Sequence, residues 1–181
     1  MKERIFLFLA GLLLSTTLPG VQNARAQVPS VGQPAPGFTL PSSTGGEISL
    51  ASLHGKYVVL VFYPRDMGNA SAAEMKSFQN DLAQYKKYGE VLGICVDPLP
   101  SHKSFAAKTG VTFPLLSDES GSVAAKYGSL GSLKGKPAAR RATFLIDPEG
   151  KIARVWGSVT SPATHSTDVV NTLSVKPPIV H

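Results

Sequence analysis

Cysteine is almost absent from this chain, since Cys95 is the only one among 181 residues. A single cysteine excludes an intramolecular disulfide, a C-x-x-C redox motif and a cysteine-rich zinc site. The four histidines lack H-E-x-x-H spacing, so we expect neither a metal site nor another cofactor. No long run of one charge sign occurs, and the net charge of +6 does not predict a nucleic-acid partner. With 43% hydrophobic and 17% charged residues, the composition is that of a folded domain.

Long hydrophobic runs are also missing. The longest, residues 5–18, has 14 residues and is too short to cross a bilayer comfortably as a helix. It follows the charged residues Lys2 to Arg4 and precedes Ala24-Arg25-Ala26, a small-x-small cleavage pattern. We therefore predict a secretory signal peptide over residues 1–26, although an uncleaved anchor is the alternative. The protein is then exported, to the periplasm or another extracytoplasmic compartment, with no membrane span left after cleavage.

The rest of the chain predicts one domain over residues 27–175 and a loose tail over 176–181, which contains Pro177-Pro178. Short apolar runs predict strands at residues 38–40, 47–50, 57–63, 91–96, 113–116, 142–146 and 151–156. Helical patterns cover residues 71–87, 101–109, 120–127 and 163–173. This order predicts a thioredoxin-like α/β fold: a central mixed sheet with helices on both faces and an N-terminal β-hairpin.

The longest predicted helix follows the strongest predicted strand. Met75, Phe78, Leu82 and Tyr85 fall on one helical face. Ser71 and Glu74 have the spacing of a capping box, which predicts Ser71 as the N-cap of this helix.

Four stretches together carry a family resemblance. They are VGQPAPGFTLPSSTGGEISLASLHGKYVVLVFYP at 31–64, VLGICVD at 91–97, FPLLSDESGSVAAKYG at 113–128 and RATFLIDPEGKI at 141–152. In combination they resemble the peroxiredoxins of the alkyl hydroperoxide reductase/thiol-specific antioxidant superfamily, and most closely the bacterioferritin-comigratory type. The resemblance implies a thioredoxin-like fold and an antioxidant, thiol-dependent reduction of peroxides.

The resemblance implies a Pro-x-x-x-Thr-x-x-Cys signature at a strand-to-helix turn, together with a distant Arg. Here Pro64 and Arg141 match the signature, whereas Gly68 replaces the Thr and Ser71 replaces the peroxidatic Cys. A resolving Cys in the same helix would fall at Lys76. The loss does not depend on the alignment, because no cysteine precedes residue 95.

The chemistry of the signature explains why this replacement matters. A peroxidatic thiol attacks as its thiolate, whose pKa is lowered by a helix N-terminus and a nearby Arg. Attack on the peroxide gives a sulfenic acid that a second thiol must reduce. The Ser71 hydroxyl stays protonated at neutral pH, and no G-x-S-x-G elbow indicates a serine hydrolase. The sequence therefore predicts a member without thiol peroxidase activity.

Two further residues have alternative interpretations. Cys95 lies near the carboxyl end of a predicted buried strand, where it is either a one-Cys nucleophile or a small buried hydrophobe. Arg141 either forms an anion site with Ser71 at the helix N-terminus or pairs with Asp66 or Glu74.

Three functions remain open. The first is an exported, inactive peroxiredoxin-like protein that binds a small anion, a peroxide-like ligand or a protein partner. The second is a weak peroxidase that works through Cys95 and an external thiol, and the third is a disulfide exchanger, which the missing C-x-x-C opposes.

The remaining charged and aromatic candidates are interpreted as structural or solvated: Lys134, Lys136 and Arg140 in a basic loop, His54 and His102 in a loop or helix start, and His165 without an evident partner.

Overall fold

The structure is a computed structural model, and it describes residues 28–175. The predicted signal peptide and the predicted tail lie outside the described residues. Along the chain the elements are β1 (Thr39–Pro41), β2 (Glu47–Ser49), the 3-10 helix η1 (Leu50–Leu53), β3 (Tyr57–Phe62), α1 (Asn69–Asn80), α2 (Leu82–Tyr85), β4 (Gly89–Cys95), α3 (Leu99–Thr109), β5 (Leu115–Ser117), α4 (Ser122–Lys126), β6 (Leu130–Leu133), β7 (Lys136–Ala139), β8 (Ala142–Ile146), β9 (Ile152–Trp156) and α5 (His165–Ser174).

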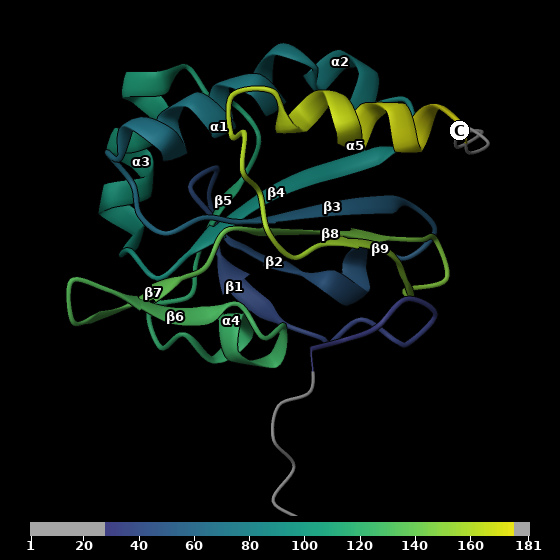
Figure 1. The fold of residues 1–181 in the computed structure, drawn as a ribbon, viewed down its shortest axis with the longest axis horizontal. Coiled ribbons are helices and arrows are strands. Elements are labelled where there is room, and N and C mark those ends of the chain that lie inside the picture. The colour runs from purple at the N-terminus through teal and green to yellow at the C-terminus, as the bar shows by residue number, and fades with distance from the viewer. Residues whose placement is uncertain (1–27, 176–181) are drawn as a thin grey trace, which may run out of the picture.

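A five-stranded mixed sheet forms the centre, in the order β5-β4-β3-β8-β9 (Figure 1). Strands β3, β4 and β5 are parallel, while β8 runs antiparallel to both β3 and β9. All six residues of β3 are buried, as expected for a continuous apolar run covered on both faces. Its side chains alternate, so Val58 and Leu60 enter one core cluster and Val59 and Val61 the other.

The two faces of the sheet are covered differently. Residues of α1, α2, α3 and α5 pack together on one face, which is the upper face in Figure 1. The other face is covered by the β1–β2 hairpin, η1, the short α4 and the β6–β7 hairpin. The predicted α/β class and N-terminal hairpin are confirmed. Helices lie on both faces, as predicted, although on the second face the short α4 and η1 share the cover with two hairpins.

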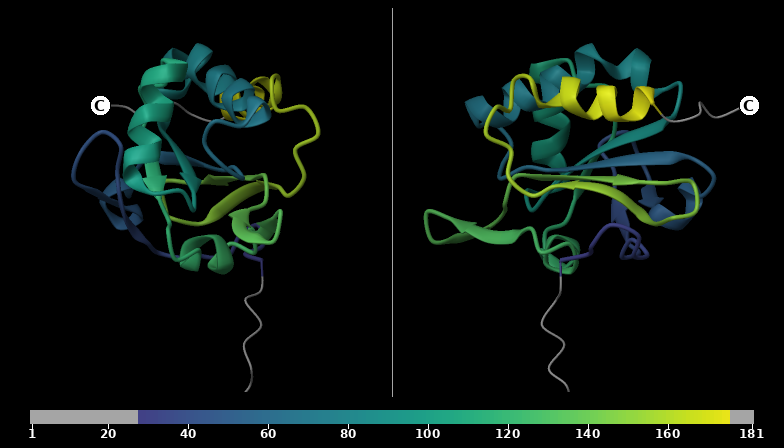
Figure 2. Two further views of the ribbon diagram at one scale, coloured as in Figure 1. Left: turned by 90° about the vertical axis from the view of Figure 1, so that its left-hand side faces the viewer. Right: turned by 45° about the vertical axis from the view of Figure 1, so that its right-hand side comes forward.

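Two segments depart most clearly from the sequence prediction, while most other boundaries shift by one to three residues. The helix predicted over 71–87 begins at Asn69 and is interrupted at Asp81, which separates α1 from α2. Of the predicted helical face, Met75, Phe78 and Tyr85 are nevertheless buried, and Leu82 is partly buried against the same core. The predicted basic loop contains the β6–β7 hairpin, which projects from the body of the molecule (Figures 1 and 2).

Candidate functional site

Ser71 lies in the turn that leads from the carboxyl end of β3 into α1. Gly68 is the N-cap, with extended dihedral angles (φ −77°, ψ 135°) and no side-chain cap, and Ala72 makes a backbone hydrogen bond to its carbonyl at 2.8 Å. Ser71 is therefore the third residue of the helix and is buried, at 3% exposure. The prediction of Ser71 as the N-cap is wrong, because the helix begins one turn earlier than the capping-box spacing indicated. Pro64 is half-buried at the start of the same turn.

Glu74, one turn further along α1, pairs with Arg141 just before β8. The Arg141 guanidinium donates a hydrogen bond to Glu74 Oε2, and the Glu74 side chain is fully buried. Among the described residues, Glu74 Oε1 has no hydrogen-bond partner. Burial raises the pKa of Glu74 to about 7, although the Arg141 charge opposes this shift. Of the interpretations open for Arg141, the structure thus shows the ion pair with Glu74.

Asp66, the other predicted candidate partner of Arg141, instead pairs with His102. His102 Nδ1 lies 2.9 Å from Asp66 Oδ2, and both side chains are almost fully buried. Tyr63 and Ser101 donate hydroxyl hydrogen bonds to the same carboxylate, at 2.9 and 2.6 Å. Burial raises the pKa of Asp66, but the hydrogen bonds from His102 and Ser101 outweigh it and leave the pKa below its usual value. This network joins the turn after β3 to α3.

Sequence reasoning missed the Asp66–His102 pair. Thirty-six residues separate the two along the chain, and no motif links them. His102 lies in the first turn of α3, which agrees with its prediction as a helix-start residue, but it is completely buried, and that prediction gave no hint of an acidic partner. The available signal was the position of each residue just beyond a predicted parallel strand, since the carboxyl ends of such strands share one edge of the sheet.

Cys95 is the last residue of β4 and lies in the same region. It is completely buried, and its sulfur accepts a hydrogen bond from the Asp97 amide at 3.4 Å. Burial raises the pKa of the Cys95 thiol well above its usual value, and the Asp66 charge adds to this effect. The thiol is therefore protonated at neutral pH, which is the state expected of a structural cysteine.

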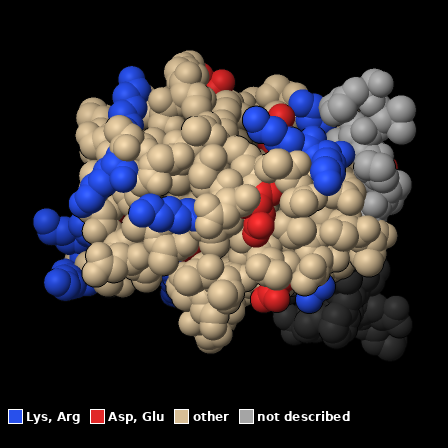
Figure 3. Space-filling model, turned by 90° about the horizontal axis from the view of Figure 1, so that it is seen from above, with Lys and Arg blue, Asp and Glu red and all other residues tan. Residues whose placement is uncertain are grey.

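Basic side chains surround the outside of the turn. A cavity of about 300 Å³ is lined by Arg65 from the turn and by Leu133, Lys134 and Lys136 from the β6–β7 hairpin. In the view from above, Lys and Arg gather at the end of the molecule where this hairpin and α3 lie (Figure 3). The Ser71 turn consequently has a positively charged rim, whereas the half-buried Arg141 is neutralised by Glu74.

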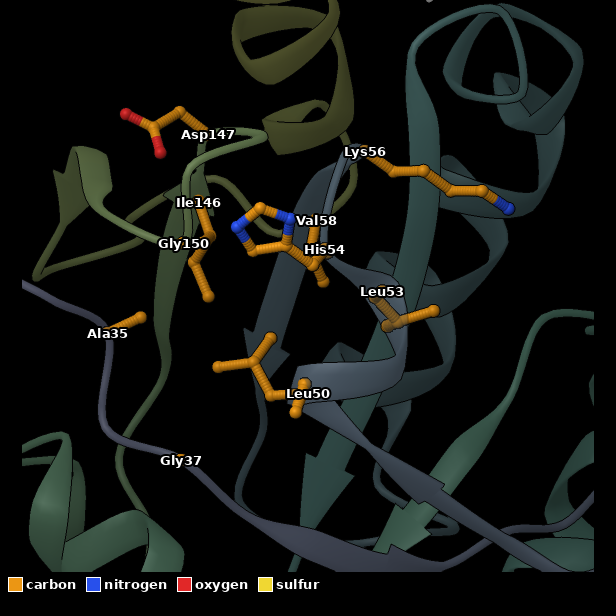
Figure 4. A pocket seen from close by; sticks show the side chains of 11 residues that line it. Ala35, Gly37, Leu50, Leu53, His54, Lys56, Val58, Ile146, Asp147 and Gly150 are labelled. Carbon is orange, nitrogen blue, oxygen red and sulfur yellow. The ribbon is translucent and has the colours of Figure 1, made fainter. Parts of the chain in front are cut away.

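A second cavity lies at the opposite end of β3. It measures about 180 Å³ and is mostly apolar, with Val58, Leu50 and Ile146 among its lining residues. The His54 and Asp147 side chains stand near its rim (Figure 4). None of the residues of the predicted site contributes to it.

The remaining histidine, His165, is buried and hydrogen-bonds Thr143 Oγ1 at 2.9 Å, which supplies the partner that the sequence did not reveal.

With this geometry in place, comparison with known proteins decides the family. Residues 31–155 match the model of the AhpC/TSA family. The chain belongs to this family. A Coxiella burnetii protein that carries the name peroxiredoxin bcp is 42% identical over an aligned length of 134 residues, and the alignment covers 71% of this chain and 89% of that protein.

Solved structures of AhpC/TSA relatives share the fold. Peroxidoxin BcpB of Mycobacterium tuberculosis superposes with a TM-score of 0.76 at 32% identity, covering 82% of this chain and 99% of that one. PrxQ of Xylella fastidiosa, solved as a cysteine-to-serine mutant, gives 0.75 at 30% identity, covering 81% and 96%. The thioredoxin-like fold implied by the resemblance is thereby confirmed. Within residues 28–175, no helix has the length and apolar character needed to cross a membrane.

Proposed function

We propose that this AhpC/TSA protein is exported and no longer reduces peroxides by thiol chemistry, and that it acts as a binding module on a peroxiredoxin scaffold. The observation that carries the proposal is the side chain of residue 71. Ser71 occupies the first turn of α1, behind Pro64, where the family signature carries the attacking cysteine. Peroxide does not oxidise a serine hydroxyl as it oxidises a thiolate, so Ser71 forms no sulfenic acid.

Cys95 does not supply a replacement nucleophile. Its side chain is completely buried, and burial raises the pKa of its thiol, whereas a peroxidatic thiol must be exposed and ionised. The alternative of a weak one-Cys peroxidase is therefore disfavoured by the surroundings of this residue.

The ligand that fits the Ser71 turn best is a small anion. The amino-terminal end of α1 carries the positive end of the helix dipole, and Arg65, Lys134 and Lys136 add charge at the rim. Arg141 contributes when Glu74 is protonated, since the ion pair otherwise neutralises it. A peroxide-like ligand or an acidic segment of a partner protein would meet the same groups. Export rests on the signal-peptide pattern of residues 1–26.

The deciding experiment is peroxide consumption by the purified protein with excess dithiothreitol or thioredoxin. We expect no rate above that of the reductants alone. The Cys95→Ser variant is the matched control, and a rate comparable to that of an intact relative, abolished by this substitution, would overturn the proposal. Thiol labelling gives an independent check: Cys95 should react slowly in the native protein and quickly in denaturant, because only unfolding exposes it.

A further inference from the structure

Three side chains with metal-binding atoms meet beneath the turn that follows β3. Asp66 lies on this turn, Cys95 ends β4, and His102 belongs to the first half of α3. One oxygen, one sulfur and one nitrogen from these residues all lie within 4.8 Å of one another. Asp66 is 6% exposed and the other two are fully buried, so the atoms converge inside the protein and not on its surface.

The contacts of His102 resemble those of a metal ligand. Its Nε2 lies 3.1 Å from the carbonyl oxygen of Leu116, an acceptor that requires Nε2 to carry the hydrogen. Nδ1 faces Asp66 Oδ2 at 2.9 Å, where in the metal-free protein it donates the proton that the two groups share, and loss of that proton leaves an Nδ1 lone pair directed at the carboxylate. Two acceptors at this distance need a cation between them, either a proton or a metal ion. Metal-binding histidines commonly donate their far N–H to a backbone carbonyl in this way.

The other two side chains are also held by outer hydrogen bonds. The Asp66 carboxylate accepts from the Tyr63 and Ser101 hydroxyls at 2.9 and 2.6 Å. The Cys95 sulfur accepts from the Asp97 amide at 3.4 Å. Such contacts orient metal ligands and support the negative charge of a carboxylate or a thiolate. Each of the three converging groups therefore has a partner that fixes its direction.

We propose that Asp66, Cys95 and His102 bind one divalent transition-metal ion of the zinc class. A mixed oxygen, sulfur and nitrogen set suits zinc, which takes carboxylate, thiolate and imidazole ligands in tetrahedral geometry. Three side chains leave the fourth coordination position open. The Tyr63 hydroxyl lies 3.4 Å from His102 Nδ1, so its oxygen is close to this position. The Asp66 oxygen and Nδ1, now 2.9 Å apart, separate to about 3.4 Å in tetrahedral coordination, which rotation of the carboxylate provides.

Binding involves proton release and no redox change. The metal ion forms bonds to the sulfur, to Nδ1 and to a carboxylate oxygen, while the Cys95 thiol proton and the proton shared by His102 and Asp66 pass to solvent. Because Asp66 sits on the turn, the ion would tie this turn to β4 and α3. Access to the buried ligands requires the turn to open, so uptake should be faster during refolding than into the native protein.

Cobalt(II) is the probe that reports the ligands directly. The full-length protein without an affinity tag is refolded with one equivalent of Co²⁺, dialysed, and examined by absorption spectroscopy and metal analysis. We expect one cobalt ion per chain, tetrahedral visible bands and a thiolate-to-cobalt charge-transfer band, all displaced by Zn²⁺. Cys95→Ser should abolish the charge-transfer band, and Tyr63→Phe should weaken binding about 10- to 100-fold by removing an outer contact of Asp66.

His54→Gln is the matched control, because His54 is exposed and lies at the other end of β3. It should leave the spectrum unchanged. Cobalt that is not retained by the wild-type protein, or a charge-transfer band that survives in folded Cys95→Ser, would overturn the proposal. If Cys95→Ser does not fold, the wild-type protein still decides: Zn²⁺ should raise its thermal midpoint and that of His54→Gln equally, and no rise in either contradicts the site.

Discussion

Residue 71 carries an oxygen where the signature of the AhpC/TSA family carries a sulfur. The surrounding turn keeps the features that activate a thiol, namely Pro64, the amino-terminal end of α1 and a nearby arginine. Two nearby residues also shape this turn. Gly68 leaves the helix without a side-chain cap, and Glu74 pairs with Arg141. Residue 71 therefore accounts for the lost thiol chemistry, and Gly68 and Glu74 would hinder its recovery.

Restoring the signature should restore a reactive thiol in part. In a Cys95→Ser background, Ser71→Cys with Gly68→Thr should give a thiol with a pKa below the ordinary value of about 8.5, because the helix N-terminus favours the thiolate. Gly68 has extended backbone angles, and an added Cβ would lie 3.5 Å from Ser71 Oγ, so threonine fits there and can cap the helix.

The thiolate titration is followed by ultraviolet absorbance, and sulfenic acid formation by trapping after peroxide addition. Peroxide turnover should be weak and should depend on an external thiol, since the position of a resolving cysteine is Lys76. The Cys95→Ser single variant is the control for background signals. An unshifted thiol pKa without any sulfenic acid would show that the turn does not activate residue 71.

Glu74 should make the stability of the protein depend on pH. Burial raises its pKa from 4.5 to about 7, so the folded state binds the proton more tightly than the unfolded state. The stabilisation from this protonation is complete below pH 4.5 and is lost as the pH rises through 7. Its upper limit is about 3 kcal/mol of unfolding free energy.

The comparison that isolates this effect is wild type against Glu74→Gln in urea unfolding at pH 5, 6, 7 and 8. The glutamine resembles the protonated carboxyl, so the stability of wild type relative to the variant should fall across this range. Parallel stability curves for the two proteins would contradict the raised pKa.

At the scale of elements, hydrophobic pattern predicted the strands better than it predicted the helix ends. The run from Ala142 to Ile146 became β8 with the predicted bounds, because a short, mostly apolar run has few ways to be buried other than as an inner strand of a sheet. The start of α1 was misplaced because Ser71 and Glu74 have capping-box spacing but are both buried in the helix. Tertiary contacts determined their positions, and local propensity did not.

The β6–β7 hairpin was missed for a similar reason. Lys134 and Gly135 form its turn, both with positive φ, of 51° and 76°. Glycine adopts such angles readily, but a lysine at the preceding position gives no turn signal of the Asn-Gly or Asp-Gly kind. The strands themselves are short and only partly buried, and they also lack the apolar alternation that indicates a strand.

The pairing of β3 with β4 depends on a glycine. Gly89 begins β4 opposite Tyr57, and a Cβ built at Gly89 would lie 1.8 Å from the Tyr57 carbonyl oxygen. Gly89→Ala must therefore push apart two backbones of the central sheet, and we expect it to lower the unfolding free energy by about 2–3 kcal/mol. Gly157→Ala is the control, since no heavy atom lies within 4 Å of a Cβ there.

Thermal or urea unfolding of both variants checks this expectation. The Gly157→Ala protein should match wild type within about 0.5 kcal/mol. Equal stability of the two variants would mean that the register between β3 and β4 differs from the one described.

At the scale of the whole molecule, the topology brings together residues that the sequence keeps apart. The parallel order of β3, β4 and β5 places the ends of these strands at one edge, where Asp66, Cys95 and His102 meet. Family motifs gave the position of Ser71 and the involvement of Arg141, and the structure supplied the Glu74 partner. The buried cluster could not be read from motifs, because its members come from three elements and have no fixed spacing. The absence of H-E-x-x-H spacing therefore said nothing about ligands that meet only on folding.

Charge across the molecule leads to the last prediction, which concerns anion binding at the Ser71 turn. Arg65, Lys134 and Lys136 form the rim, and Arg141 lies inside, paired with Glu74. If binding requires Arg141 to be free of Glu74, affinity follows the protonated fraction of a carboxyl whose pKa is about 7. That fraction rises from about 10% at pH 8 to about 90% at pH 6, so affinity should rise about tenfold. His165, another titratable group near Arg141, has its pKa lowered by burial, which opposes its protonation toward the acidic end of this range.

Sulfate is the probe for this measurement, because its charge is constant between pH 6 and pH 8. Titration calorimetry should give tighter binding to wild type at pH 6 than at pH 8, and tight, pH-independent binding to Glu74→Gln. Lys134→Gln with Lys136→Gln should weaken binding at both pH values and reduce its salt dependence, since these side chains act only through the field at the rim. Lys76→Gln, which changes an exposed lysine on α1 outside the cavity, is the matched control for the loss of a positive charge. Binding to Glu74→Gln that still depends on pH would mean that another group controls access to Arg141.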